Sequence, residues 1–234
     1  MSTGAILTAA GSGSRLGSAL PKALVELDGV PLVAHAARRL AESGLVRALV
    51  IMCPPGFAER VFDAVAPFCT IPFTVVDGGA TRQASVAAGL AALADVDDVV
   101  LVHDAARPLA SVDLIGRLVA AIEAGFDAVV PGIPVVDTIK EVDGSAVPRA
   151  LATLRRSRLR AIQTPQAFRT AVLVAAHTAG AHRARSEESA ASDDAALVES
   201  AGTVVRVIEG EDCAMKITTA RDLAIATLLL EESR

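Results

Sequence analysis

Short apolar runs alternate with segments of helical spacing over the first 130 residues. Strand-like apolar runs occupy residues 5–10, 48–52, 72–76, 99–102 and 126–130. Helical spacing of apolar residues occurs at 31–43, 57–66, 81–94 and 112–124. Strands that alternate with helices of this length form βαβ units with right-handed crossovers. The pattern therefore predicts an α/β fold with a mostly parallel twisted sheet and helices on both of its faces.

The alternation stops at about residue 133, and residues 133–163 have a different pattern. They contain β-branched runs, an Asp143-Gly144 turn signal and Pro148, followed by four arginines at 155, 156, 158 and 160. This pattern predicts a β-hairpin arm that projects from the sheet. Because a projecting arm exposes strand edges, we expect a second copy of the chain to cover it in a homodimer.

After the arm, the chain returns to alternating elements. The pattern predicts regular structure at 168–179, a polar stretch at 182–192, a helix at 193–200, a strand at 203–208 and a final helix at 219–232. The acidic residues Glu187, Glu188, Asp193 and Asp194 are interpreted as a solvated face and helix N-terminus. No linker separates two parts, so we expect residues 1–234 to form a single domain that carries the arm.

Composition and charge narrow the possible functions. The chain of 234 residues is 52% hydrophobic, enough for a buried core, which excludes intrinsic disorder. A net charge of −5 and the absence of Trp and Tyr speak against nucleic-acid binding and attraction to anionic membranes. No run of about 18 apolar residues and no signal peptide is seen. Three widely spaced cysteines show no zinc pattern, so we expect reduced thiols and a cytoplasmic protein without a membrane partner.

A Gly-rich segment, AAGSGSRLG at residues 9–17, follows the first predicted strand. Such turns let backbone N–H groups approach phosphate oxygens, and Arg15 and Lys22 add two cations. The segment lacks the Gly-Lys-Ser/Thr of a Walker A loop. Its glycines also lack the G-x-G-x-x-G spacing of dinucleotide-binding proteins, which excludes NAD(P)-dependent reduction. We interpret it as a phosphate-binding loop, and a plain turn is the alternative.

Two further loops follow predicted strands at the same sheet edge, where α/β proteins bind ligands. In HDAARP, residues 103–108, Asp104 is placed to hold Mg²⁺ and Arg107 to contact a phosphate, while His103 is expected to be packed. In the Gly78-Gly79 loop, Arg82 and Ser85 face the same way in a helical first turn that favours an anion. A capped loop and ordinary N-cap chemistry are the alternatives for the two segments.

Two candidate segments are less informative alone. Lys216 is a cation within a predicted apolar strand, MKIT at 215–218, and a solvated edge lysine is the alternative. Gln163-Thr164-Pro165-Gln166 by itself reads only as a turn.

Together these segments resemble the sugar-phosphate nucleotidyltransferases, and within them the 2-C-methyl-D-erythritol 4-phosphate cytidylyltransferases. The resemblance implies a Rossmann-like α/β fold. The segments that carry the resemblance are AAGSGSRLG with Pro-Lys, GGATRQASV, HDAARP, the Asp-Thr of the arm, QTPQ, and MKIT with Arg-Asp-Leu. They extend from about residue 5 to 225. HDAARP with QTPQ is more specific than the Gly-rich loop, which uridylyltransferases share. Ala84 departs from the Asp that the family often has there.

The resemblance implies a role for each matching residue. Arg15, Lys22, Arg156 and Lys216 would be catalytic, the first two by stabilising charge on the α-phosphate. The nucleotide would be held by Ala9, Ala10, Gly11, Ser12, Gly13, Gly79, Arg82, Ser85, Asp104 and Ala105. The acceptor phosphate would be held by Arg107, Thr138, Arg156, Thr164, Ser192 and Lys216. Asp104 would lie beside a Mg²⁺ cofactor, and Arg156 would come from the partner's arm.

The implied reaction transfers CMP from CTP to 2-C-methyl-D-erythritol 4-phosphate and releases pyrophosphate. Such a transfer needs positioning and charge neutralisation rather than a covalent nucleophile, and the sequence has no G-x-S-x-G elbow or Cys/His pairing. One alternative is a cytidylyl- or uridylyltransferase that acts on another polyol or sugar phosphate, such as ribitol 5-phosphate. A non-catalytic nucleotide-binding module is a second alternative, although Arg15, Lys22 and Lys216 are all present.

Overall fold

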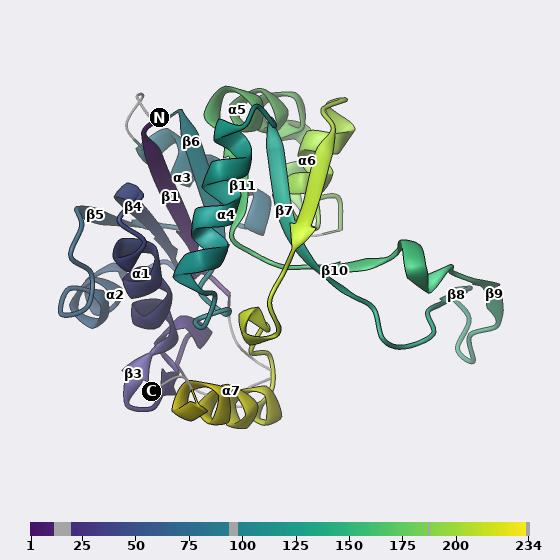
Figure 1. Ribbon diagram of the computed structural model, residues 1–234, viewed down its shortest axis with the longest axis horizontal. Helices are drawn as coiled ribbons and strands as arrows, with labels where there is room; N and C mark the ends of the chain where they lie inside the picture. The colour runs from purple at the N-terminus through teal and green to yellow at the C-terminus, as the bar shows by residue number, and fades with distance from the viewer. Residues whose placement is uncertain (12–19, 94–97, 187, 233–234) are drawn as a thin grey trace.

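The computed structural model describes residues 1–11, 20–93, 98–186 and 188–232 (Figure 1). Its central sheet contains β1 (Thr3–Thr8), β4 (Val46–Cys53), β5 (Phe73–Asp77), β6 (Val99–Asp104), β7 (Ala128–Pro134), β10 (Arg160–Ile162), β11 (Gln166–Arg169) and β12 (Val205–Glu209). The helices are α1 (Leu32–Glu42), α2 (Ala58–Val65), α3 (Arg82–Ala92), α4 (Val112–Glu123), α5 (Thr170–Ala179), α6 (Asp194–Ser200) and α7 (Ala220–Glu232). Small two-stranded sheets pair β2 (Glu26–Leu27) with β3 (Val30–Pro31) and β8 (Lys140–Val142) with β9 (Ala150–Thr153).

The mostly parallel α/β sheet predicted from the sequence is confirmed. Its path is β10-β7-β11-β6-β1-β4-β5, and β12 pairs with β7. β1 is parallel to β4 and β6, β4 to β5, and β12 to β7, while β10 and β11 run antiparallel to their neighbours. Both antiparallel strands follow the β8–β9 hairpin of the arm in the chain, and they lie on either side of β7, from which the arm leaves. This is where the βαβ pattern stops. The sheet is therefore mixed at that side.

Two apolar cores cover the faces of the sheet. Because successive side chains of a strand point to opposite faces, Ala5 and Leu7 pack with the core that contains α1, α2 and α4 residues, whereas Ile6 packs with α3, α5 and α6 residues. Because both faces of the sheet are buried, the side chains on both sides of each central strand are apolar, and the strand sequences are continuous apolar runs. Helices on both faces were predicted correctly, and no helix in the described part of the chain is long and apolar enough to cross a membrane.

The hairpin arm is also present. β7 runs outward, β8 and β9 pair antiparallel at a distance from the body, and β10 returns along β7 (Figure 1). A 3-10 turn, η3 (Arg156–Arg158), lies between β9 and β10. Apolar side chains on the arm are exposed, including Val136 at 78% and Val147 at 88%. These residues have no core of their own to pack into.

Two expectations near the sheet edge were wrong. β6 continues through His103 and Asp104, because Leu7 and Thr8 of β1 extend the parallel ladder beside them. Residues 215–218 do not form a strand: they follow the 3-10 turn η5 (Asp212–Ala214) without a ladder partner, and only Ile217 N–H reaches a neighbouring carbonyl, that of Ala106. An apolar run is therefore not always a strand, since tertiary contacts also bury irregular backbone.

Candidate active site

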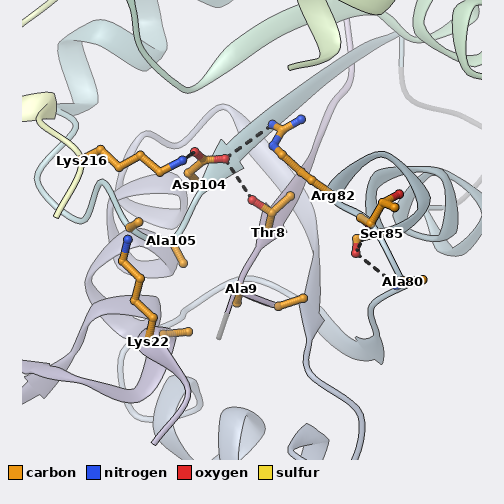
Figure 2. Close-up of a pocket in the computed structure, with 15 residues that line it drawn as sticks. Thr8, Ala9, Lys22, Ala80, Arg82, Ser85, Asp104, Ala105 and Lys216 are labelled. Carbon is orange, nitrogen blue, oxygen red and sulfur yellow. Dashed lines mark hydrogen bonds and ion pairs between the residues drawn. The ribbon is translucent and has the colours of Figure 1, made fainter. Parts of the chain in front are cut away.

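A cavity of about 250 Å³ opens at the carboxyl edge of the sheet, between the segments that follow β1, β5 and β6 (Figure 2). The predicted nucleotide-binding residues that line it are Ala9, Ala10, Gly11, Gly79, Arg82, Ser85, Asp104 and Ala105. Lys22, in the 3-10 turn η2 (Lys22–Leu24), and Lys216 line it as well. Ser12, Gly13 and Arg15 fall outside the described residues. The described parts of the three loops expected at this edge, residues 9–11, 79–82 and 104–106, do meet there.

A second cavity, of about 230 Å³, adjoins the first. Three predicted acceptor-binding residues line it, Arg107, Thr164 and Ser192. Arg82, Asp104 and Lys216 line both cavities. Two neighbouring cavities with three shared charged residues can place two anionic substrates against each other.

Asp104 lies at this junction and is held by groups from three directions. Its Oδ2 accepts from Lys216 Nζ at 2.7 Å, and its Oδ1 accepts from Thr8 Oγ1 at 3.0 Å and lies 3.5 Å from an Arg82 nitrogen (Figure 2). Burial alone would raise the pKa of Asp104, but Arg82 and Lys216 outweigh it and hold this pKa well below its usual range. The carboxylate is therefore ionised at neutral pH.

Arg82 is the first residue of α3, whose N-cap Thr81 accepts a hydrogen bond from Ala84 N–H. Its Nη1 donates to Asp194 Oδ2 at 2.7 Å. Burial opposes the charge, but Asp194 and Asp104 together raise the pKa of Arg82, so the guanidinium stays protonated. The expectation that Asp194 belongs to a solvated acidic face was wrong: its side chain is 2% exposed, because it lies against Arg82 of α3 and His177 of α5.

The Gly78-Gly79 loop is shaped by close packing against the start of α3. Gly79 N–H donates to Ser85 Oγ, which in turn donates to the Thr81 carbonyl. A Cβ at Gly79 would lie only 2.5 Å from Ala84 Cβ, so only glycine fits here. Ser85 is thus placed at the wall of the first cavity, as the sequence predicted.

The side chain of Thr164 is held by the last two residues of β6, His103 and Asp104. Its Oγ1 accepts from Asp104 N–H at 3.0 Å and lies 2.9 Å from His103 Nδ1, while His103 Nε2 is 3.2 Å from the Arg107 carbonyl. Burial is the main cause that lowers the pKa of His103 to about 4. The ring is therefore neutral at pH 7: Nε2–H donates to the carbonyl and Nδ1 accepts from the Thr164 hydroxyl. His103 is packed, as predicted.

Backbone contacts fix the segment that carries Lys216. Arg107 Nη1 donates to the Ala214 carbonyl at 2.7 Å and Nη2 to the Ile162 carbonyl at 3.2 Å. The Gln163 side chain bonds both the N–H and the carbonyl of Glu211. Arg107 thus braces the Lys216 segment in this structure, and its contact with a phosphate stays a prediction.

The structure does not bring the two arm residues to this pocket in the same chain. Thr138 and Arg156 are exposed on the arm, and Arg156 donates to the Val136 carbonyl within it. Neither residue lines either cavity. Their role in binding the acceptor stays a prediction that needs a partner's arm.

The donor set suits a magnesium ion held mainly by phosphate oxygens. No group of three or more His, Cys, Asp or Glu side chains able to hold a metal occurs in the part of the chain described. The first cavity offers the single ionised carboxylate of Asp104 among its described lining residues. Mg²⁺ keeps several waters and is commonly bound by one or two carboxylates together with substrate phosphates. Asp104 therefore fits a Mg²⁺ ion that arrives with a nucleotide.

Two residues of the site were not predicted from the sequence to have a role in it. Thr8 contacts Asp104 from the last position of β1, and Asp194 holds Arg82 from the first turn of α6. Position at the carboxyl end of a central strand could have indicated Thr8. Nothing local could have indicated Asp194, because it is 112 residues from Arg82.

Comparisons with known proteins indicate one family. The profile of the family described as 2-C-methyl-D-erythritol 4-phosphate cytidylyltransferase (IspD) matches residues 3–232. The chain is 44% identical over 239 residues to the protein of that name from Streptomyces avermitilis, covering 99% of this chain and 93% of the other. It is 40% identical to that of Corynebacterium diphtheriae, covering 98% and 93%.

Solved structures give the same result. A crystal structure titled 4-diphosphocytidyl-2C-methyl-D-erythritol synthase, from Anaerococcus prevotii, has a TM-score of 0.83 at 27% identity and covers 98% of this chain and 96% of the other. A crystal structure of 2-C-methyl-D-erythritol 4-phosphate cytidylyltransferase from Thermus thermophilus has a TM-score of 0.77 at 35% identity, with 99% and 100% covered.

Proposed function

This chain belongs to the 2-C-methyl-D-erythritol 4-phosphate cytidylyltransferase family. We propose that its two substrates bind in different cavities. The enzyme transfers CMP from CTP to 2-C-methyl-D-erythritol 4-phosphate in isoprenoid precursor biosynthesis. CTP occupies the first cavity, along the segments after β1 and β5. The acceptor phosphate occupies the second, beside Thr164 and Ser192.

One observation carries this assignment: both cavities are lined by Arg82, Asp104 and Lys216. The reacting atoms must meet where the two sites join, since phosphoryl transfer requires the attacking oxygen and the leaving group to be in line. The junction carries two cations around one buried carboxylate. The α-phosphorus of CTP therefore lies at the junction, with the acceptor phosphate on the Thr164 side.

The chemical step needs charge neutralisation more than proton transfer. An acceptor phosphate oxygen forms a bond to the α-phosphorus, and the bond from that phosphorus to the bridging oxygen breaks, so pyrophosphate leaves with that electron pair. The attacking phosphate is already anionic at neutral pH, so no general base is needed. Lys22 and Lys216, which both line the first cavity (Figure 2), stabilise the charge that develops on the α-phosphate, Lys216 from the acceptor side. Arg15 is assigned the same role as Lys22 on the basis of the sequence.

Mg²⁺ is the proposed cofactor, and Asp104 is the side chain that would hold it. When bound, the ion would neutralise the triphosphate and act as a Lewis acid on its oxygens. Lys216 and Arg82 surround the same carboxylate, so they keep Asp104 ionised and oriented before the nucleotide arrives.

We further propose that residues 1–234 are one cytoplasmic domain that works as a homodimer through the arm. Thr138 and Arg156 lie on the arm outside both cavities, and the arm exposes apolar side chains such as Val147. A partner that covers this surface would be related by two-fold symmetry. Each site would then receive Arg156 from the other subunit.

A complementation experiment tests the shared site. Lys22→Ala and Arg156→Ala are prepared separately, each is confirmed to be nearly inactive, and the two are unfolded and refolded together. If Arg156 acts in trans, a mixed dimer has one doubly defective and one intact site. Random pairing makes half of the dimers mixed, so about a quarter of the wild-type activity returns.

If Arg156 acts within its own chain, every site keeps one lesion and no activity returns. Mixing two differently tagged wild-type chains in the same protocol serves as the control, because it shows that subunits exchange. A monomer by light scattering, or no recovery despite exchange, would reject the shared site.

The alternative activity uses the same fold with another acceptor, such as ribitol 5-phosphate. The acceptors can be distinguished by the second cavity and by the arm residues that reach it, because the nucleotide side and the chemical step are common to both activities. Pyrophosphate release from CTP that depends on 2-C-methyl-D-erythritol 4-phosphate tests the proposed activity. Release that depends only on a different polyol phosphate would favour the alternative.

A further inference from the structure

We propose that Asp194 is a positioning residue for this reaction, which acts by holding Arg82 at the junction of the two cavities. This inference rests on the proposed division of the substrates between the cavities. Asp194 lies in the first turn of α6 and was expected from the sequence to be a solvated helix-start residue. The structure instead buries it against Arg82, and it lines neither cavity.

The contacts show which partner holds Arg82 more closely. Nη1 of Arg82 is 2.7 Å from Asp194 Oδ2, whereas Nη2 is 3.5 Å from Asp104 Oδ1. The guanidinium is therefore fixed by Asp194 and only approaches Asp104. These two contacts use two of the five donors of the guanidinium, and Arg82 lines both cavities.

Asp194 is itself held in place. Its Oδ1 lies 3.0 Å from His177 Nε2 of α5, and both side chains are at most 5% exposed. Burial opposes its ionisation, but Arg82 and His177 outweigh this and lower the pKa of Asp194. The carboxylate is ionised and cannot rotate without losing a buried partner, a loss that is costly in the protein interior.

Hydrogen bonds also hold together the backbone segments that carry Arg82 and Asp194. The Gln83 side chain donates to the Gly180 carbonyl and accepts from Ala191 N–H, and Thr81 Oγ1 donates to the Ala184 carbonyl. These bonds join the start of α3 to the segment that leads into α6. Asp194 and Arg82 therefore lie in segments that hydrogen bonds join directly, although the two residues are far apart in sequence.

Charges of alternating sign run through the junction: Lys216, Asp104, Arg82 and Asp194. Without the Asp194 charge, Arg82 would have Asp104 as its nearest remaining carboxylate. It would then move toward Asp104 and compete with Lys216 for the same oxygens. Asp194 thus keeps Asp104 available and keeps Arg82 exposed to an incoming phosphate.

A double-mutant cycle tests this role. Asp194→Asn keeps the shape and an oxygen for His177, but removes the charge and one acceptor that Arg82 uses. We expect kcat/KM for the acceptor, at saturating CTP, to fall by about 10- to 100-fold, within the range of coupling between contacting residues. In an Arg82→Ala background the same substitution should change kcat/KM by less than about twofold, because Asp194 acts through Arg82.

Asp127→Asn is the matched control. Asp127 pairs with Arg169 at 3.2 Å, and Arg169 pairs in the sheet with Val99 at the opposite end of β6 from Asp104. This variant also breaks an arginine–aspartate pair, but it should leave kcat/KM unchanged. Thermal unfolding of each variant shows whether the fold survives.

If Asp194→Asn does not fold, Asp194→Glu keeps the charge and displaces the carboxylate by one methylene, and the same cycle is measured with it. An equal loss in the wild-type and Arg82→Ala backgrounds would overturn the inference, as would no loss in a folded single variant. Failure of the proposed function is distinguishable, because the wild-type enzyme would then show no transfer to the acceptor at all.

Discussion

Lys22→Ala is expected to lower turnover by about 10²–10³-fold while the protein stays folded, as for other preorganised groups that stabilise a transition state. Lys22 lies in η2 and lines the first cavity, as do Ala9 and Asp104 (Figure 2). The charge on the α-phosphate grows as the new bond forms. Steady-state pyrophosphate release with both substrates saturating measures the loss.

The control is Lys22→Arg, which keeps the charge on a longer and differently shaped group and should recover part of the activity. Circular dichroism and thermal unfolding should match the wild type, because Lys22 is only half-buried. Arg15→Ala is expected to behave in the same way on the basis of the sequence alone. Near-normal turnover of folded Lys22→Ala would refute the assignment of the first cavity.

Excess chelator is expected to abolish activity, and Mg²⁺ added beyond the chelator should restore it fully. The reason is that the described part of the first cavity offers cations and one carboxylate, Asp104, to a triphosphate that carries several negative charges. Turnover measured against free Mg²⁺ concentration, at constant CTP, gives the dependence. Full activity in excess chelator would contradict the magnesium assignment.

Thermal unfolding with and without chelator is the accompanying control. The described residues provide no metal cluster that the fold would need, so chelator alone should leave the unfolding temperature unchanged. A loss of activity that accompanies unfolding would show a structural rather than a catalytic metal.

Local pattern was sufficient to predict the main architecture, because each helix and each central-sheet strand of the first 130 residues carries its own periodicity. Apolar alternation and spacing located β4 and α1 to within two residues. The Asp143-Gly144 turn and the arginine cluster likewise indicated the arm. The errors came where tertiary contacts decide: β1 extends β6 through Asp104, and the 215–218 segment is buried without joining a sheet.

The candidate site was predictable to the extent that sheet topology brings strand ends together. Gly79, Asp104 and Lys22 were expected at one edge and do line one cavity. Asp194 was misread because its partner Arg82 comes from a distant helix, and an acidic residue near a helix start is usually solvated. Arg107 was expected to contact phosphate, yet it bonds backbone carbonyls here, a role that its sequence neighbours do not indicate.

Phosphorus NMR of the wild-type reaction with a panel of acceptors tests most directly whether the two cavities join CTP to 2-C-methyl-D-erythritol 4-phosphate. With that acceptor, the CTP and acceptor signals should decrease together while pyrophosphate and a diphosphate diester increase in equal amounts. Ribitol 5-phosphate, in a parallel sample, should give far slower conversion, because the family to which the chain belongs acts on the other acceptor. Pyrophosphate formed faster with ribitol 5-phosphate, or none formed with 2-C-methyl-D-erythritol 4-phosphate, would contradict the assignment.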